Sequence, residues 1–168
     1  MVTELKKLTT DDGRDIYDML QDIPAEENGF FNNQHVVSYE EYRAWLPSAA
    51  AAAEGTELVD GWKVPQVYYW FYVDGKPVGM CKFRIFLTEK LLESGGHIGY
   101  AIRPGERGRG YGKLMLAAML QAAREKGLDR VLITTNLDNI ASQHVALANG
   151  AVREERNPDH CHFWIDLK

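Results

Sequence analysis

The residues best suited to chemistry lie in one short segment, Arg107 to Gly112, in which three glycines alternate with larger side chains. The segment follows a stretch typical of a strand and precedes a stretch typical of a buried helix. Glycines let backbone N–H groups converge on one point, and the start of a helix adds unpaired N–H groups and a positive dipole end. Arg107, Arg109 and Lys113 add positive charge. The pattern predicts a phosphate or pyrophosphate site, and the alternative is a solvated basic turn that needs glycine for its backbone angles.

The spacing of these glycines narrows the choice of phosphate ligand. A Walker loop would place Ser or Thr after Gly112 and Lys113, where this chain has Leu114. A dinucleotide-binding loop would have a third glycine in place of Lys113 and more than one strand–helix–strand unit. What remains is Arg107-x-x-Gly110-x-Gly112. It resembles the Arg/Gln-x-x-Gly-x-Gly/Ala pyrophosphate loop of the GNAT superfamily of acyl-CoA N-acyltransferases.

Two neighbouring segments strengthen this resemblance. The segment Gly96 to Pro104 is similar to the strand that precedes the loop in that family. Asn139 to Val145, followed by Asn149 to Ala151, is similar to a later helix, and is closest to the branch that includes ribosomal-protein N-terminal acetyltransferases. The resemblance covers about Val67 to Val152. The first 66 residues fit the helix pair expected of the family but carry no motif.

The resemblance implies a fold and a cosubstrate. The fold would be α/β (α+β), with a central mixed, mostly antiparallel sheet that is splayed at an acetyl-CoA cleft and flanked by helices, in a single domain over residues 1–168. Acetyl-CoA would lie between strands 97–102 and 131–134, with its pyrophosphate on the loop and its pantetheine paired near Ile102. No metal is implied. The residues that the resemblance assigns to acetyl-CoA are Ile102, Arg107, Gly108, Arg109, Gly110, Tyr111, Gly112, Lys113, Asn139 and Ser142.

Acyl transfer to an amine needs a group that takes the ammonium proton, donors that hold the thioester oxygen, and stabilisation of the leaving thiolate. Many family members have Glu at the position of His97, and an imidazole is a suitable base near neutral pH. The alternative is that His97 only packs or hydrogen-bonds within the sheet. A backbone N–H near Ile102 would hold the thioester oxygen.

The usual general acid of the family is missing. It is a Tyr on the later helix, at the position that here is Ala146. Ser142, His144 or water are the substitutes available, and the helix N-terminus could stabilise the thiolate without an acid. Asn139 is equally well placed to be a plain N-cap, and this role is compatible with contact to CoA.

The acceptor is not specified by the sequence. Glu27 lies in a loop where the family builds its acceptor pocket, so it would attract a cationic amine or be a solvated loop carboxylate. Arg84 would bind an acceptor carboxylate or reach solvent past the sheet edge. A small amine, an amino acid, an antibiotic and a protein N-terminus all remain open. His160-Cys161-His162 offers two ligands on one strand face, which is too few for zinc.

These groups must be positioned by strands in the middle of the chain and by helices on either side. Strongly β-forming residues at 67–73, followed by Asp74-Gly75, predict a hairpin. Ser38 and Glu41 form a capping-box pattern at the start of a helix that ends in an Ala run. The sequence predicts helices at about 12–21, 38–53, 113–126 and 139–150, a loop at 22–35, and strands at 67–73, 78–87, 97–102, 131–134, 152–156 and 161–167.

Composition restricts the partners. The chain has 168 residues, 45% of them hydrophobic and 26% charged, which suits one folded domain and excludes global disorder. A net charge of −5 argues against nucleic acid and anionic membranes as general partners. The N-terminus has no signal-peptide pattern and no run is long enough to span a membrane, so we expect a cytoplasmic protein. Cys81 and Cys161 lie far apart in the sequence, so we expect both thiols to be free. The apolar segment 163–165 suggests a homodimer, or else a core strand.

The sequence therefore predicts an acetyl-CoA-dependent N-acetyltransferase that moves an acetyl group to a primary amine by direct attack on the thioester. The acceptor would be a small-molecule amine or a protein N-terminus. His97, Ser142 and Glu27 are the candidate catalytic residues. A non-catalytic acyl-CoA-binding module on the same fold is the first alternative, and an unrelated phosphate-binding protein is the second.

Overall fold

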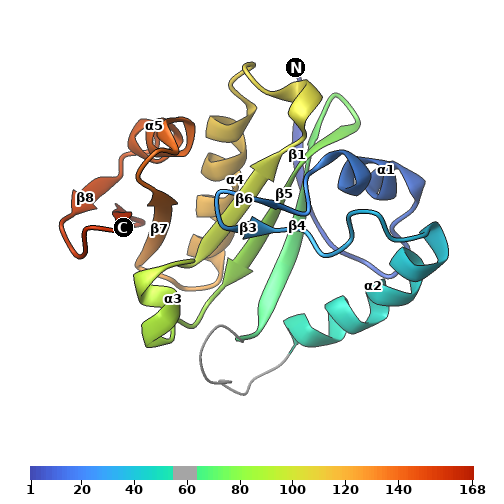
Figure 1. Cartoon of the computed structure of the whole chain (residues 1–168), viewed down its shortest axis with the longest axis horizontal. Helices are drawn as coiled ribbons and strands as arrows, with labels where there is room; N and C mark the ends of the chain where they lie inside the picture. Colours follow the sequence, from blue (N-terminus) through green and yellow to red (C-terminus); the bar gives the residue numbers. More distant parts are fainter. Residues whose placement is uncertain (55–63) are drawn as a thin grey trace.

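The computed structural model describes residues 1–54 and 64–168 and contains two antiparallel sheets that lie side by side (Figure 1). The larger sheet has the order β1-β4-β5-β6, and the smaller has the order β7-β9-β8. A separate short hairpin, β2–β3, crosses in front of the larger sheet. The strands are β1 (Thr3–Lys7), β2 (Glu26–Glu27), β3 (Phe30–Phe31), β4 (Gln66–Val73), β5 (Lys76–Arg84), β6 (Ile98–Ile102), β7 (Arg130–Asn136), β8 (Val152–Glu154) and β9 (His160–Asp166).

The helices cover both faces of the larger sheet, with α4 behind it and α1 and α2 on the other side (Figure 1). The predicted capping box is present, because the Ser38 hydroxyl accepts from the Glu41 N–H and the Glu41 carboxylate accepts from the Ser38 N–H. The helices are α1 (Arg14–Asp22), α2 (Tyr39–Ala53), α3 (Glu89–Glu93), α4 (Tyr111–Glu125) and α5 (Ile140–Ala148), with a 3₁₀ turn at Pro104–Glu106.

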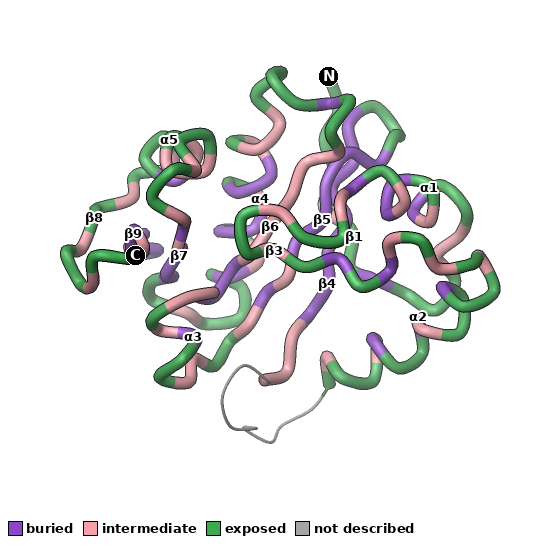
Figure 2. The backbone as a smooth tube through the Cα atoms, in the orientation of Figure 1, coloured by how far each residue is buried: buried purple, intermediate pink, exposed green. Residues whose placement is uncertain are grey.

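Alternation along β4 divides the core in two. Tyr68 and Trp70 pack under α1 and α2, whereas Tyr69 and Phe71 pack against α4. Both faces of this central strand are therefore buried, as Figure 2 shows in purple. The hairpin from β4 to β5 turns at Asp74-Gly75, where both residues have positive φ (49° and 80°), as a type I′ turn requires.

Three strands and one α-helix were not predicted. β1 is a mostly exposed, charged strand that is held by backbone pairing to β4, so it has no clear hydrophobic pattern. The predicted loop 22–35 contains the β2–β3 hairpin, and the segment between β5 and β6 contains α3, capped by Thr88. Strand β5 also begins and ends earlier than predicted, and α4 begins at Tyr111 rather than Lys113.

The segment that suggested a dimer is a core strand. β9 lies in the middle of the smaller sheet, and Phe163 and Ile165 are buried there. The homodimer stays a prediction, and these two buried side chains are not available to form its contact surface. Cys81 and Cys161 are free and buried, as predicted. None of the helices that the structure describes is long and apolar enough to cross a membrane.

The two sheets meet at one end of β6 and separate along its length. The His97 N–H donates to the Leu132 carbonyl (2.9 Å), and the Leu132 N–H donates to Nδ1 of His97 (2.8 Å). At Gly96, which has φ of +64°, an added Cβ would lie 2.5 Å from the Leu132 carbonyl oxygen. Glycine is thus needed where the backbones of the two sheets come closest. The predicted splayed sheet is confirmed.

Candidate active site

A cavity of about 900 Å³ lies where β6 and β7 separate. Residues of β6 and β7 form its walls. The loop before α4 and the start of α5 line one end of the cavity, and the β2–β3 hairpin and β5 line the other end. Because side chains alternate along β6, Tyr100 and Ile102 face the α4 side, and Gly99 and Ala101 face the hairpin. The cavity therefore reaches both faces of the sheet.

At the loop end of the cavity, the glycine-rich segment lies between strand β6 and the start of helix α4, as the sequence predicted. Gly110 is the N-cap of α4 in the left-handed conformation (φ +81°), and Gly108 has φ of +78°. An added Cβ at Gly112 would lie 3.2 Å from Cγ2 of Val145, so α5 packs closely on the helix start. Glu27 lines the cavity, as do most of the residues that the resemblance assigns to acetyl-CoA: Ile102, Arg107, Gly108, Gly110, Tyr111, Gly112, Lys113, Asn139 and Ser142.

Arg109 differs from these residues. It is absent from the cavity lining, and its Nη1 lies 3.5 Å from a carboxylate oxygen of Glu106. The same carboxylate accepts a 2.6 Å hydrogen bond from Lys76. Arg109 therefore supports the loop from outside the cavity in this structure.

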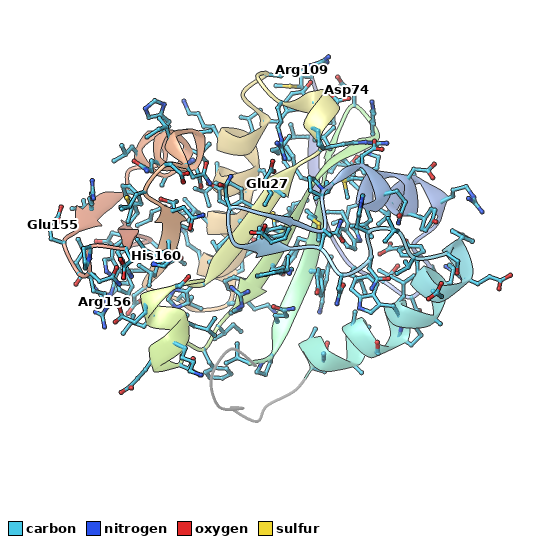
Figure 3. The ribbon with its side chains drawn as sticks, viewed as in Figure 1. Glu27, Asp74, Arg109, Glu155, Arg156 and His160 are labelled. Atoms are coloured by element: carbon cyan, nitrogen blue, oxygen red, sulfur yellow. The ribbon has the colours of Figure 1, made fainter. Side chains whose placement is uncertain are left out.

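Arg107 joins the loop to the hairpin. Its Nε donates to the Ile102 carbonyl (3.0 Å), while its Nη1 and Nη2 donate to the two carboxylate oxygens of Glu27 (3.2 and 2.6 Å). The hydrogen bond from Arg107 holds the pKa of Glu27 below its ordinary value. Figure 3 places Glu27 on the hairpin, in front of the sheet. The carboxylate predicted to attract an amine is thus occupied by the arginine predicted to bind pyrophosphate.

In the middle of the cavity, Tyr100 and Ser142 approach from opposite walls. Their hydroxyl oxygens are 2.9 Å apart. Burial raises the pKa of Tyr100 to about 12, so the phenol is protonated at neutral pH. Asn139 caps α5, since its side-chain oxygen accepts from the Ser142 N–H (3.3 Å).

His97 does not line the cavity. It is 9% exposed, its Nδ1 accepts from the Leu132 N–H, and its ring lies edge-on to Trp164 with centroids 6.4 Å apart. Burial, with smaller effects of Arg130 and Arg84, lowers the pKa of His97 to about 4. The structure therefore favours the structural alternative for this residue.

The other end of the cavity is lined by polar groups from distant parts of the chain. Lys82 and Arg84 come from β5, Ser94 from the end of α3, and His160 from the start of β9. Nε2 of His160 lies 3.5 Å from the Ser94 hydroxyl, and Figure 3 shows His160 on the side of the smaller sheet. No three or more His, Cys, Asp or Glu side chains come together as a metal site within residues 1–54 and 64–168.

A family model described as the acetyltransferase (GNAT) domain matches residues 3–152. The chain belongs to the GNAT acetyltransferase family. Because it belongs to this family, the chain is an N-acetyltransferase. A search of curated protein sequences found no match.

Solved structures of similar fold share little sequence with this GNAT domain. RimL, a ribosomal L7/L12 alpha-N-protein acetyltransferase in complex with coenzyme A, is 18% identical with a TM-score of 0.72, and 99% of this chain and 94% of that chain are covered. A GNAT-family acetyltransferase from Streptococcus pneumoniae is 15% identical (TM-score 0.65; 98% and 99% covered). The Campylobacter jejuni N-acetyltransferase PseH, in complex with acetyl coenzyme A, is 11% identical (TM-score 0.65; 98% and 99% covered). At these identities the likeness shows the fold.

Some cavity residues of this GNAT domain were missed by the sequence analysis. Tyr100 lies in the segment that resembles the family strand but was assigned no role, and Lys82 carried no motif, although each alternates with small or apolar neighbours on a predicted strand. His160 was considered only as a metal ligand, and its place in the cavity depends on the position of β9 beside β7. Pairing between distant strands is a signal that a single sequence does not carry.

Proposed function

We propose that this GNAT domain transfers the acetyl group of acetyl-CoA to a primary amine by direct attack on the thioester. The observation that supports this proposal best is the cavity between β6 and β7, which has a glycine-rich helix start at one end and reaches both faces of the sheet. A donor can enter from the α4 side, and an acceptor can enter from the hairpin side.

The loop end suits the donor. The N–H groups of Gly108 to Lys113 and the positive end of α4 would hold the pyrophosphate, with Lys113 adding a charge. Exposed edges of β6 and β7 would pair with the amide groups of the pantetheine arm near Ile102. Arg107 would exchange its carboxylate partner, Glu27, for a phosphate oxygen.

In the reaction, the amine nitrogen bonds to the thioester carbon, the carbon–sulfur bond breaks, and the thiolate leaves with the electron pair. The nitrogen then gives up a second proton to become the amide, and this proton replaces the one that the thiolate takes up. The ammonium must first lose a proton. We assign this step to His160, because it is an imidazole that lines the cavity, in place of His97, which does not.

The leaving thiolate can be protonated from within the cavity. Tyr100 is a neutral phenol at the wall next to Ser142, and it supplies the proton donor that the sequence lacks at Ala146. The acceptor is a small amine or a protein N-terminus. RimL and a Salmonella typhimurium acetyltransferase that modifies the N-terminal serine of ribosomal protein L7/L12 are structures of similar fold.

The test is release of free thiol from acetyl-CoA with a panel of amines, together with calorimetry of CoA binding. We expect CoA to bind and thiol to appear only when an amine is present. Binding of CoA without turnover by any amine would favour the non-catalytic module. Binding of nucleotides in preference to CoA would favour an unrelated phosphate-binding protein.

A further inference from the structure

Two positively charged side chains of β5 line the hairpin side of the cavity without a carboxylate partner. Lys82 and Arg84 are two residues apart, so they share the sheet face that lies under the hairpin. Within the described residues no Asp or Glu forms an ion pair with either of them. Glu27, the carboxylate of the overlying hairpin, is held by Arg107 instead.

The hydrogen bonds of this pair are incomplete. Nζ of Lys82 donates to the Phe31 carbonyl and lies 4.7 Å from the centroid of the Phe30 ring. Nη1 of Arg84 donates to the carbonyls of Gly95 (3.5 Å) and Gly96 (3.2 Å), and Nε is shielded from solvent without a partner. Neutral carbonyls satisfy some donors but leave both charges without a counter-ion.

The surroundings of the pair disfavour both positive charges. Burial and the charge of Arg84 lower the pKa of Lys82 to about 8. Burial also lowers the pKa of Arg84. A partly buried charge without a partner destabilises the folded protein. An anion bound between Lys82 and Arg84 would stabilise both charges at once.

The pair faces the cavity beside a position that has no side chain. Gly99 of β6 lies directly opposite Lys82 and has no side chain, and Ala101 is the next residue on the same face. An added Cβ at Gly99 would lie 3.5 Å from the Phe30 ring, so the hairpin forms a roof over this position. Both cations line the same cavity as the separated strands where the thioester would lie, so a small molecule in this cavity can contact them.

We propose that the acceptor is a small amine that also carries an anionic group, a carboxylate or a phosphate, which binds Lys82 and Arg84 while the amine faces the thioester. This inference rests on the proposed function, since it names the acceptor class of the same cavity. Each cation would form a charge-assisted hydrogen bond to the anion. The bound anion would also orient the amine relative to His160.

The experiment compares amines that differ only in the anionic group. Thiol release from acetyl-CoA is measured with free amino acids, with the corresponding amino-acid amides, with phosphoethanolamine against ethanolamine, and with a neutral peptide that has a free N-terminus. We expect kcat/KM to be at least about tenfold higher for the anionic member of one pair, because charged hydrogen bonds are strong. The amino-acid and phosphate arms distinguish the two sources of charge.

Variants locate the effect. Lys82→Met and Arg84→Met should each raise KM for the anionic amine by at least about tenfold and change KM for acetyl-CoA less than about twofold. Lys126→Met removes the same charge from the exposed end of α4 and should change neither value. Thermal stability of the Lys82 variant should be unchanged or higher, whereas a merely structural role would lower it.

A binding measurement keeps this inference separate from the proposed function. Calorimetry compares an N-acetyl amino acid, which has a free carboxylate, with its amide, which has none. Only the carboxylate compound should lose affinity when Lys82 or Arg84 is replaced. If no amine releases thiol but this preference is found, the proposed function fails and the anion site stands. Equal binding of the two compounds, or equal use of neutral and anionic amines, would overturn the inference.

Discussion

The two ends of the cavity are built in different ways. The loop end comes from one continuous segment, Arg107 to Lys113, whose glycines and helix start form the site by local backbone geometry. The acceptor end is assembled from the β2–β3 hairpin, β5, α3 and β9. These elements lie far apart in the sequence, since 130 positions separate Phe30 from His160. The hydrogen bonds of Arg107 to Glu27 connect the two ends directly.

This difference bears on what each end recognises. Backbone N–H groups and a helix dipole suit a phosphate, and they tolerate changes elsewhere in the chain. Side chains from separate elements suit a particular acceptor, and a change in any one of them alters the fit. We therefore expect the donor to be shared with other GNAT proteins and the acceptor to be specific to this chain.

The largest expected effect is at the acceptor end, on His160. If it accepts the ammonium proton, His160→Gln should lower kcat by about a hundredfold, since general-base catalysis contributes about 10²–10⁴-fold. The affinity for CoA should stay within about twofold, because the loop end is untouched. His97→Gln is the matched control and should keep kcat. Loss of kcat in the His97 variant alone would restore the hypothesis made from sequence.

His97, at the junction of the two sheets, should affect stability rather than catalysis. Its pKa is lowered from 6.5 to about 4 in the folded state. Above pH 6.5 both folded and unfolded states hold a neutral ring, and between pH 6.5 and 4 only the unfolded state takes up the proton. Stability should therefore fall by up to about 3 kcal/mol as the pH falls through this range.

Chemical denaturation at several pH values tests this prediction. His97→Gln cannot titrate but can still accept from the Leu132 N–H, so its stability should vary less with pH. His144→Gln, on the exposed side of α5, should retain the wild-type dependence. An unchanged profile in the His97 variant would show that its ring titrates normally in the folded protein.

A change at Gly110 should break the loop end alone. A Val side chain disfavours the positive φ of 81° and would crowd the backbone N–H groups around a phosphate. We expect Gly110→Val to weaken CoA binding by well over about tenfold, or about 1.4 kcal/mol or more. Gly127→Val carries similar strain (φ +87°) beyond the other end of α4 and should lower stability without changing CoA affinity. Unchanged calorimetric affinity in a folded Gly110 variant would remove the loop from the donor site.

The smallest effect is expected at the contact between the ends. Glu27→Gln frees Arg107 for a phosphate, and because both side chains are about 40% exposed the ion pair is worth little. CoA affinity should rise by no more than about threefold. Glu26→Gln removes the same charge from the same hairpin and should leave the affinity unchanged. A tenfold loss of kcat without a change in affinity would instead place Glu27 at the acceptor amine.

Several features could be predicted from the sequence because they depend on neighbouring residues. The Asp74-Gly75 turn, the capping box of α2 and the glycine-rich start of α4 are each specified within four to seven residues, where backbone preferences act directly. The loop motif also carried the family resemblance, and with it the expected sheet and cosubstrate. The two edge strands of the larger sheet differ in their sequence signal. β6 contains part of the family motif, whereas β1 has a single apolar residue, Leu5, among polar and charged ones.

The tertiary structure alone decided which ionisable groups face the cavity. His97 and His160 are both near the ends of strands in the sequence, yet the backbone of Leu132 binds the first and the pairing of β9 with β7 brings the second to the cavity wall. Lys82 and Arg84 likewise acquire their role from a hairpin about 50 residues away that leaves them without a carboxylate. Residue types and local spacing determined the donor end, whereas contacts between distant segments determined the acceptor end, because burial and charge depend on every element that packs around a side chain.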